Sequence, residues 1–211
     1  MQQDRGLTLY QIFFIFILPI ALLVFGIVPI AWRMVVLCIS MLLMYGVIQH
    51  EKISDEAMGL SKNTFRKALI PYLLFTLIGA FVFVRLSNVL AINPNILWWQ
   101  HAHFLFLFLP VSLLQEIAYR GFLFPKLKVL SQKWWVIIGA NTVLFTILHV
   151  IYPIPGIMLP VAFFSGLALS VMYRYYPNLL LVSFAHAVLN FIAVLHGFFF
   201  WFSPPVFSFT S

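Results

Sequence analysis

Charged side chains are scarce in this chain of 211 residues, which has 12 Lys and Arg, five Asp and Glu, and 64% hydrophobic residues. A soluble domain carries about 25% charged residues, whereas only 8% are charged here, so a soluble fold is excluded. Intrinsic disorder requires low hydropathy and high charge, and it is excluded as well. The single cysteine, Cys38, excludes an internal disulfide and a Cys-rich metal or iron–sulfur site. The mean hydropathy of +1.06 indicates an integral membrane protein.

Several apolar runs are long enough to cross a bilayer, which takes about 20 residues for a helix. They predict an all-α, polytopic bundle of about seven transmembrane helices, forming one membrane-embedded domain over residues 1–211. One long polar stretch, 49–67, separates the second run from the third. A Pro-Ile-Pro-Gly segment at 153–156 breaks the chain after the fifth. The predicted spans are about 9–30, 35–48, 68–92, 103–124, 134–152, 157–173 and 179–202.

The basic residues gather in alternate loops between these spans. The formal net charge of +7 is therefore better explained by membrane topology than by nucleic-acid binding. Because positively charged loops face the cytoplasm, we predict a cytoplasmic N-terminus and an external C-terminus. The residues that set this orientation are Arg5, Lys52, Lys62, Arg66, Lys67, Lys126, Lys128, Lys133 and Arg174.

Polar residues inside the fourth predicted span form the first group that needs an explanation. A charged group near the bilayer centre costs at least about 2.5–3.5 kcal/mol. Glu116 and Arg120 are four residues apart, so they share a helical face and can pair. Gln115 lies about 100° around the helix from Glu116. Taken alone, the pair fits a packing ion pair as well as it fits a functional site.

Two further groups lie in the fifth and seventh predicted spans. Phe145 and His149 are four residues apart, with Thr142 on the same stripe of the helix. His186 and Asn190 have the same spacing. Asn and His in hydrocarbon need hydrogen-bond partners, which another helix must supply. Each group alone is again consistent with packing.

Together the three groups predict one polar cavity within the membrane. An imidazole can carry a proton near neutral pH, an amide can hold an oxyanion, and a carboxylate can activate water. Counting about 1.5 Å per residue places Glu116 and His186 toward the cytoplasmic side, but His149 near the outer end of its span. Convergence therefore requires that the fifth helix tilts or begins deeper than Trp134.

The order and spacing of these residues resemble the signature of the CPBP family, the CAAX-processing and bacteriocin-processing (Abi) glutamic intramembrane proteases. The family's usual motifs are Glu-Glu-x-x-x-Arg, Phe-x-x-x-His and His-x-x-x-Asn or Asp. The likeness covers about 113–192, within a family-like catalytic core that we predict at about 101–202. It implies catalytic roles for Gln115, Glu116, His149, His186 and Asn190, and supporting roles for Arg120 and Phe145.

One position departs from the family pattern. Gln115 stands where the family has its first glutamate, the usual water-activating base, whereas the second glutamate tends to bind the arginine. An amide cannot take a proton from water. Three interpretations are open: an isosteric substitution that inactivates the enzyme, a naturally inactive member, or a variant in which Glu116 acts as the base.

The resemblance implies a metal-free and cofactor-free mechanism. A carboxylate and His149 would activate water, while His186 and Asn190 would hold the tetrahedral oxyanion. The short chain has no eukaryotic targeting features, which suggests a bacterial plasma membrane. We therefore expect the partners to be membrane lipids and a peptide cleaved close to the membrane, such as a leader or a C-terminal sorting segment, rather than a prenylated tail.

Other functions are compatible with the same residues. An inactive family member could serve as an immunity or scaffold protein. In that case Gln115 would be the substitution that goes with the loss of catalysis. A zinc metalloprotease could use Glu116, His149 and His186 as ligands, although the chain has no His-Glu-x-x-His pair.

Overall fold

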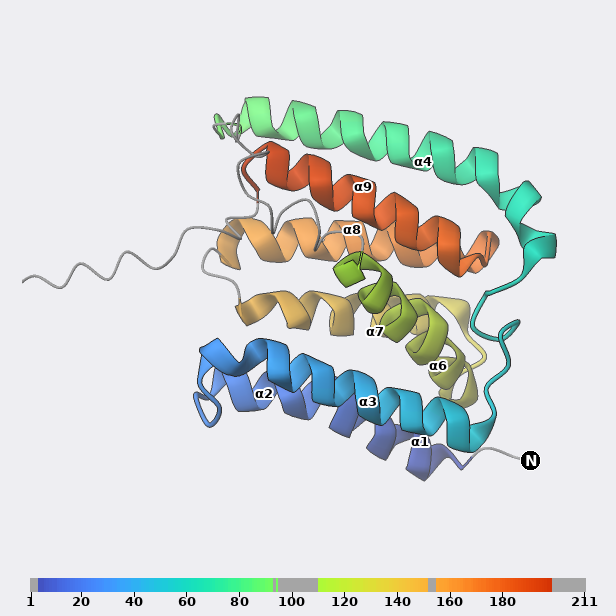
Figure 1. Ribbon diagram of the computed structural model, residues 1–211. Helices are drawn as coiled ribbons and strands as arrows, with labels where there is room; N and C mark the ends of the chain where they lie inside the picture. The colour runs from blue at the N-terminus through green and yellow to red at the C-terminus, as the bar shows by residue number, and fades with distance from the viewer. Residues whose placement is uncertain (1–3, 93, 95–109, 152–154, 199–211) are drawn as a thin grey trace, which may run out of the picture.

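The protein is a bundle of helices, most of which run side by side with similar axes (Figure 1). The computed structural model describes residues 4–92, 94, 110–151 and 155–198, and these residues form helices and no strands. Five helices are long and apolar enough to cross a membrane, and the apolar helix Leu179–Leu195 is slightly shorter. The all-α polytopic fold is thereby confirmed. The five helices are Arg5–Val24, Ile30–Glu51, Lys62–Val89, Trp134–Ile151 and Gly156–Tyr175.

These helices correspond to the first, second, third, fifth and sixth predicted spans. The fourth predicted span begins among residues 95–109 and the seventh continues past residue 198, so both lie partly outside the described residues. The second helix ends at Glu51, three residues beyond the predicted 35–48. Hydropathy therefore located the spans, and their ends differ by a few residues.

The N-terminal half consists of a helical hairpin and one long helix. The carboxylate of Asp4 accepts a hydrogen bond from the Gly6 amide at 2.8 Å and so starts the first helix. The second arm runs back along the first, and the long helix lies on the far side of the bundle (Figure 1). The elements are α1 (Arg5–Ile12), the π-helix η1 (Phe13–Ile17), α2 (Leu18–Val24), the 3₁₀ helix η2 (Ile30–Trp32), α3 (Arg33–Glu51) and α4 (Lys62–Val89).

The C-terminal half begins with helical residues 110–116 and contains every predicted site residue. Its last helix is capped by Asn178, whose Oδ1 accepts the Leu181 amide at 3.0 Å. The remaining elements are the π-helix η4 (Ile117–Leu123), α6 (Phe124–Leu130), α7 (Trp134–Ile147), the 3₁₀ turn η5 (Leu148–Ile151), α8 (Pro155–Tyr175) and α9 (Leu179–Leu195).

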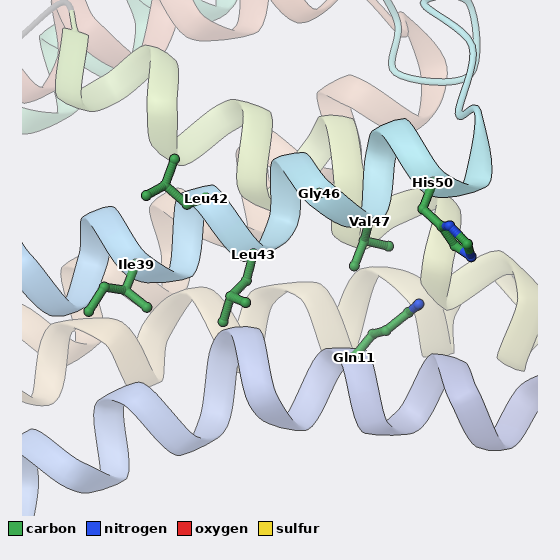
Figure 2. Close-up of a pocket in the computed structure, with 7 residues that line it drawn as sticks. All are labelled: Gln11, Ile39, Leu42, Leu43, Gly46, Val47 and His50. Carbon is green, nitrogen blue, oxygen red and sulfur yellow. The ribbon is translucent and has the colours of Figure 1, made fainter.

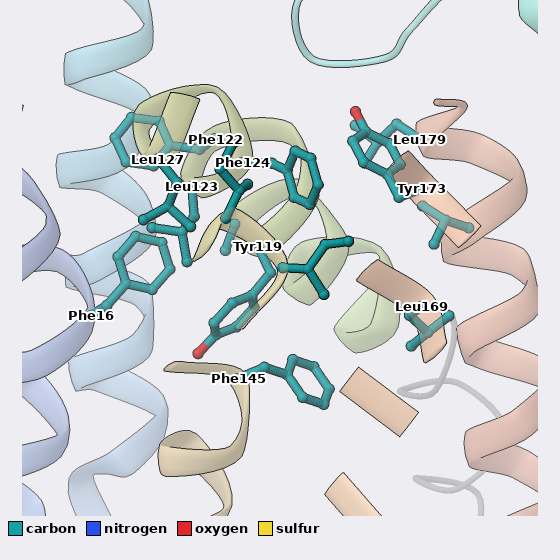
Figure 3. Close-up of a cluster of buried hydrophobic side chains, with 14 of the residues drawn as sticks. Phe16, Tyr119, Phe122, Leu123, Phe124, Leu127, Phe145, Leu169, Tyr173 and Leu179 are labelled. Carbon is teal, nitrogen blue, oxygen red and sulfur yellow. The ribbon is translucent and has the colours of Figure 1, made fainter. Parts of the chain in front are cut away.

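The π-helix η4 lies at the centre of the packing. Helix α7 packs along α8, and α4 packs along α9. The second pair is close because Gly79 has no side chain: a Cβ there would lie 2.7 Å from Leu189 Cδ2. Apolar side chains of η4 and its neighbours form one buried cluster (Figure 3). It contains Phe122 and Leu123 of η4 together with Phe16, Phe145, Leu169 and Leu179.

A buried ion pair joins the N-terminal hairpin to this core. Lys126 pairs with Glu51, and Gln11 Nε2 donates to the same carboxylate at 2.6 Å. The sequence suggested that Lys126 is a loop residue serving as a topology signal, but it lies in α6 and is 1% exposed. The contact also brings two of the predicted basic loops to one end of the bundle, as the positive-inside pattern requires.

A mostly apolar groove lies between α1 and α3 (Figure 2). Its volume is about 460 Å³. No predicted site residue lines it, so the predicted polar site lies elsewhere, in the interior of the bundle. The lining residues are Gln11, Ile39, Leu42, Leu43, Gly46, Val47 and His50.

Candidate active site

Glu116 is the centre of the buried polar site. Its side chain is 0% exposed. Its Oε1 accepts hydrogen bonds from Arg120 Nη1 at 2.9 Å and from His186 Nδ1 at 2.6 Å. Its Oε2 has no hydrogen-bond partner among the described residues. One carboxylate oxygen is therefore held from two sides, and the other is available to a further donor.

The π-helix η4 follows Glu116 directly. Its wider turn lets the Tyr119 carbonyl accept from the Phe124 amide and also from Asn141 Nδ2 of α7, at 2.6 Å. Asn141 thereby bonds a neighbouring helix. Turns of π-helix occur frequently at functional sites. Here the π-helix fixes α7 against the segment that carries Glu116 and Arg120.

Arg120 is anchored to α8 on its other side. Its Nη2 donates to the Gly166 carbonyl at 3.0 Å and to Ser170 Oγ at 3.4 Å. Ser170 Oγ in turn donates to Asn141 Oδ1 at 3.0 Å. This network orients the guanidinium toward Glu116 and partly satisfies a charge that is 0% exposed.

The ring of Phe145 is the point where the three motifs meet. Its centroid lies 4.9 Å from that of His149, 5.7 Å from that of His186 and 5.0 Å from Arg120 Cζ. Figure 3 shows Phe145 beside Tyr119, and their centroids are 5.2 Å apart. The three helices therefore converge as the sequence predicts.

His149 lies near the end of the helix Trp134–Ile151, where the residue count places it. It is buried in the 3₁₀ turn η5 and still reaches the other site residues. Both histidines lie against the same Phe145 ring.

The hydrogen bonds define the tautomer of His149. Its Nδ1 lies 2.9 Å from the Phe145 carbonyl, and a carbonyl oxygen only accepts. Nδ1 of a neutral His149 therefore carries the hydrogen, and Nε2 is the acceptor nitrogen of the ring. His186 similarly donates its Nδ1 hydrogen to the ionised Glu116, so its Nε2 can donate only when the ring is protonated.

Asn190 and Gln115 lie at the margin of the site, and both are half-buried. Asn190 Nδ2 donates to Ser112 Oγ at 3.1 Å, and its second N–H remains for another acceptor. Ser112 is fully buried and lies four residues before Glu116. That spacing is visible in the sequence and could have singled out Ser112, whereas nothing in the sequence marks Gly166 or Ser170.

The side chains do not form a metal-binding set. Among the described residues, no three His, Cys, Asp or Glu side chains converge so that they could hold a metal ion. Glu116, His149 and His186 are therefore not arranged as the zinc ligands of the alternative interpretation.

Replacing Gly166 by alanine is expected to disturb this site. The added Cβ would lie 2.7 Å from Phe145 Cδ1, and overpacking of this kind costs about 1–3 kcal/mol. We expect Gly166→Ala to lower the melting temperature in detergent. The matched control is Gly139→Ala on α7, where no atom lies within 4 Å of the new Cβ. Equal melting temperatures for both variants would contradict the described packing of Phe145.

Comparison with known protein families gives a match in the part of the chain that contains this site. Residues 97–192 match the family model named Rce1-like, whose description is type II CAAX prenyl endopeptidase Rce1-like. No curated protein and no solved structure matches the chain significantly. The matched segment includes Glu116, Arg120, His149, His186 and Asn190.

Proposed function

Because residues 97–192 make this chain a member of the CAAX protease (CPBP) family, we propose that it is a glutamic-type intramembrane endopeptidase whose general base is Glu116. The family and the long apolar helices identify an integral membrane protein of the endopeptidase class. The catalytic assignment rests on the geometry of the buried polar site.

The observation that carries the proposal is the free oxygen of Glu116. Glu116 contacts His186, and the other four acidic residues all lie at position 56 or earlier in the sequence. Its Oε1 is occupied by Arg120 and His186, while its buried Oε2 has no partner among the described residues. Glu116 can therefore keep its arginine and still accept a proton. It can serve as the base although Gln115, at the family's usual base position, cannot.

The proposed reaction is hydrolysis by an activated water. Glu116 Oε2 takes a proton from water, and the hydroxide attacks the carbonyl carbon of the scissile peptide bond. The second N–H of Asn190, together with Nε2 of a protonated His186, holds the tetrahedral oxyanion. Collapse breaks the C–N bond, and the proton held on Glu116 passes to the leaving amine. The family resemblance implies that His149 helps the carboxylate to activate the water.

The proposed substrate is a peptide segment close to the membrane surface. Leader peptides and C-terminal sorting segments fit a bacterial plasma membrane, and prenylated C-terminal tails are the third class to test. The mostly apolar surroundings of the site favour a segment that enters from the bilayer, since little water competes there for its backbone.

A second function is favoured by one specific observation. Gln115 removes the carboxylate from the position where the family has its usual base. An inactive member of this kind could bind peptides without cleaving them and act as an immunity or scaffold protein.

The test is cleavage by the purified protein in liposomes. A panel of a farnesylated CAAX peptide, a leader peptide and a C-terminal sorting peptide is incubated with it, and new termini are identified by mass spectrometry. We expect one class to be cut at one bond, and cutting to persist with a metal chelator. Binding of a peptide without any new terminus would support the inactive function instead.

A further inference from the structure

Ser112 is a buried serine one helical turn before Glu116, and the proposed reaction gives it no role. Its side chain is 0% exposed. A buried hydroxyl needs a hydrogen-bond partner, and Ser112 Oγ accepts a hydrogen bond from Asn190 Nδ2 at 3.1 Å. This bond therefore joins the segment that carries the proposed base to the residue that the family resemblance assigns to the oxyanion.

The bond is one of two that connect the helical segment 110–116 to α9. The other joins Glu116 Oε1 to His186 Nδ1 at 2.6 Å. Between the two bonds the segment goes back by four residues, from Glu116 to Ser112, while α9 goes forward by four, from His186 to Asn190. The two helices therefore run antiparallel here, and the bonds lie one turn, about 6 Å, apart along them. The four side chains and the two helical turns form a closed ring.

This ring restrains an amide that would otherwise be free to turn. Asn190 is only half-buried, and the last side-chain torsion of asparagine has a broad range of allowed angles. A donor stabilises an oxyanion well only when it already points to the place where the charge develops. Packing is a weaker reason for the bond, since hydrogen bonds between membrane helices contribute little to stability on average. Holding the amide in one orientation is therefore the more consequential effect of the Ser112 hydroxyl.

We propose that Ser112 is a positioning residue that holds the Asn190 amide, so that its second N–H binds the oxyanion of the tetrahedral intermediate. The proposal rests on the proposed peptidase function. Ser112 contacts neither the water nor the peptide in this reaction, and no bond forms or breaks at its hydroxyl. It sets the separation between the base and the oxyanion donor, because Ser112 and Glu116 belong to the same helical turn.

Removing the hydroxyl in two backgrounds tests this role. We expect Ser112→Ala to lower kcat about tenfold, the equivalent of one hydrogen bond, with KM unchanged, because the oxyanion forms only during the reaction. Asn190→Ala should lower kcat about 10²–10³-fold, and adding Ser112→Ala to it should cause no further loss. The matched control is Ser183→Ala in α9, where a buried hydroxyl donates to the Leu179 carbonyl of its own helix at 2.7 Å; kcat should stay at the wild-type value. An equal fall in kcat with and without Asn190 would overturn the proposal, because Ser112 would then act through packing.

A second measurement does not depend on activity. In protein labelled with nitrogen isotope at asparagine, NMR relaxation of the Asn190 side-chain amide reports how rigidly it is held, and its signals are identified by their loss in Asn190→Ala. We expect a rigid amide in the wild type and in Ser183→Ala, and a mobile one in Ser112→Ala. If the wild type cleaves no peptide, the proposed function fails while this comparison still decides whether Ser112 holds Asn190. An amide that is as rigid in Ser112→Ala as in the wild type would overturn the proposal.

Discussion

Glu116→Gln is expected to lower kcat by about 10²–10⁴-fold, the usual contribution of a general base. The amide is isosteric with the carboxylate and retains an oxygen that Arg120 and His186 can approach, but it cannot take a proton from water. Removing the anion of a buried ion pair also destabilises the protein, but less than removing Arg120, since Arg120 still donates to the Gly166 carbonyl and to Ser170. The measurement is single-turnover cleavage in liposomes, with the melting temperature measured on the same preparation.

The matched control for this substitution is Glu56→Gln. Glu56 is an exposed acid in the connection between α3 and α4, so its loss removes the same charge from the surface and not from the buried polar site. We expect wild-type kcat for this variant. A Glu116→Gln protein that remains folded and cleaves at the wild-type rate would remove Glu116 from the mechanism.

Arg120→Met should destabilise the protein by about 3–5 kcal/mol, because it leaves the buried charge of Glu116 without its cation. The arginine also ties η4 to α8 through Gly166 and Ser170. We expect a large fall in the melting temperature in detergent and little folded protein in the membrane. The exposed Arg174 provides the control, since Arg174→Met should leave stability almost unchanged.

The double variant Arg120→Met, Glu116→Gln separates charge pairing from packing. Replacing both partners of a buried ion pair is much less costly than removing one of them. We therefore expect the double variant to be more stable than Arg120→Met alone. A double variant that is less stable than the single one would show that Arg120 acts through packing and not through Glu116.

Much of the fold follows from hydropathy. Runs of about 20 apolar residues predict spanning helices, and the helices Lys62–Val89 and Trp134–Ile151 lie where those runs are. Features that depend on tertiary contacts could not be predicted in this way. The burial of Lys126 depends on Glu51, which is 75 residues away in the chain, and hydropathy alone assigns both residues to the membrane surface.

The site was predictable in its residues but not in its arrangement. A spacing of four residues shows that two side chains share a helix face, but not which helix lies opposite. The contact between Glu116 and His186 spans 70 residues; the need of buried polar groups for partners predicts that the groups meet, but not which atoms pair. The anchor of Arg120 at Gly166 is a backbone carbonyl, which any residue could supply, so no side-chain pattern reveals it.

The most direct test of the central claim compares the chain as it stands with Gln115→Glu. If Glu116 is the general base, the protein with Gln115 cleaves its peptide, and the measured rate depends on Glu116 whichever residue occupies position 115. Cleavage that appears only in Gln115→Glu, with the wild type binding the same peptide and leaving it intact, would contradict the claim and identify an inactive member of the family.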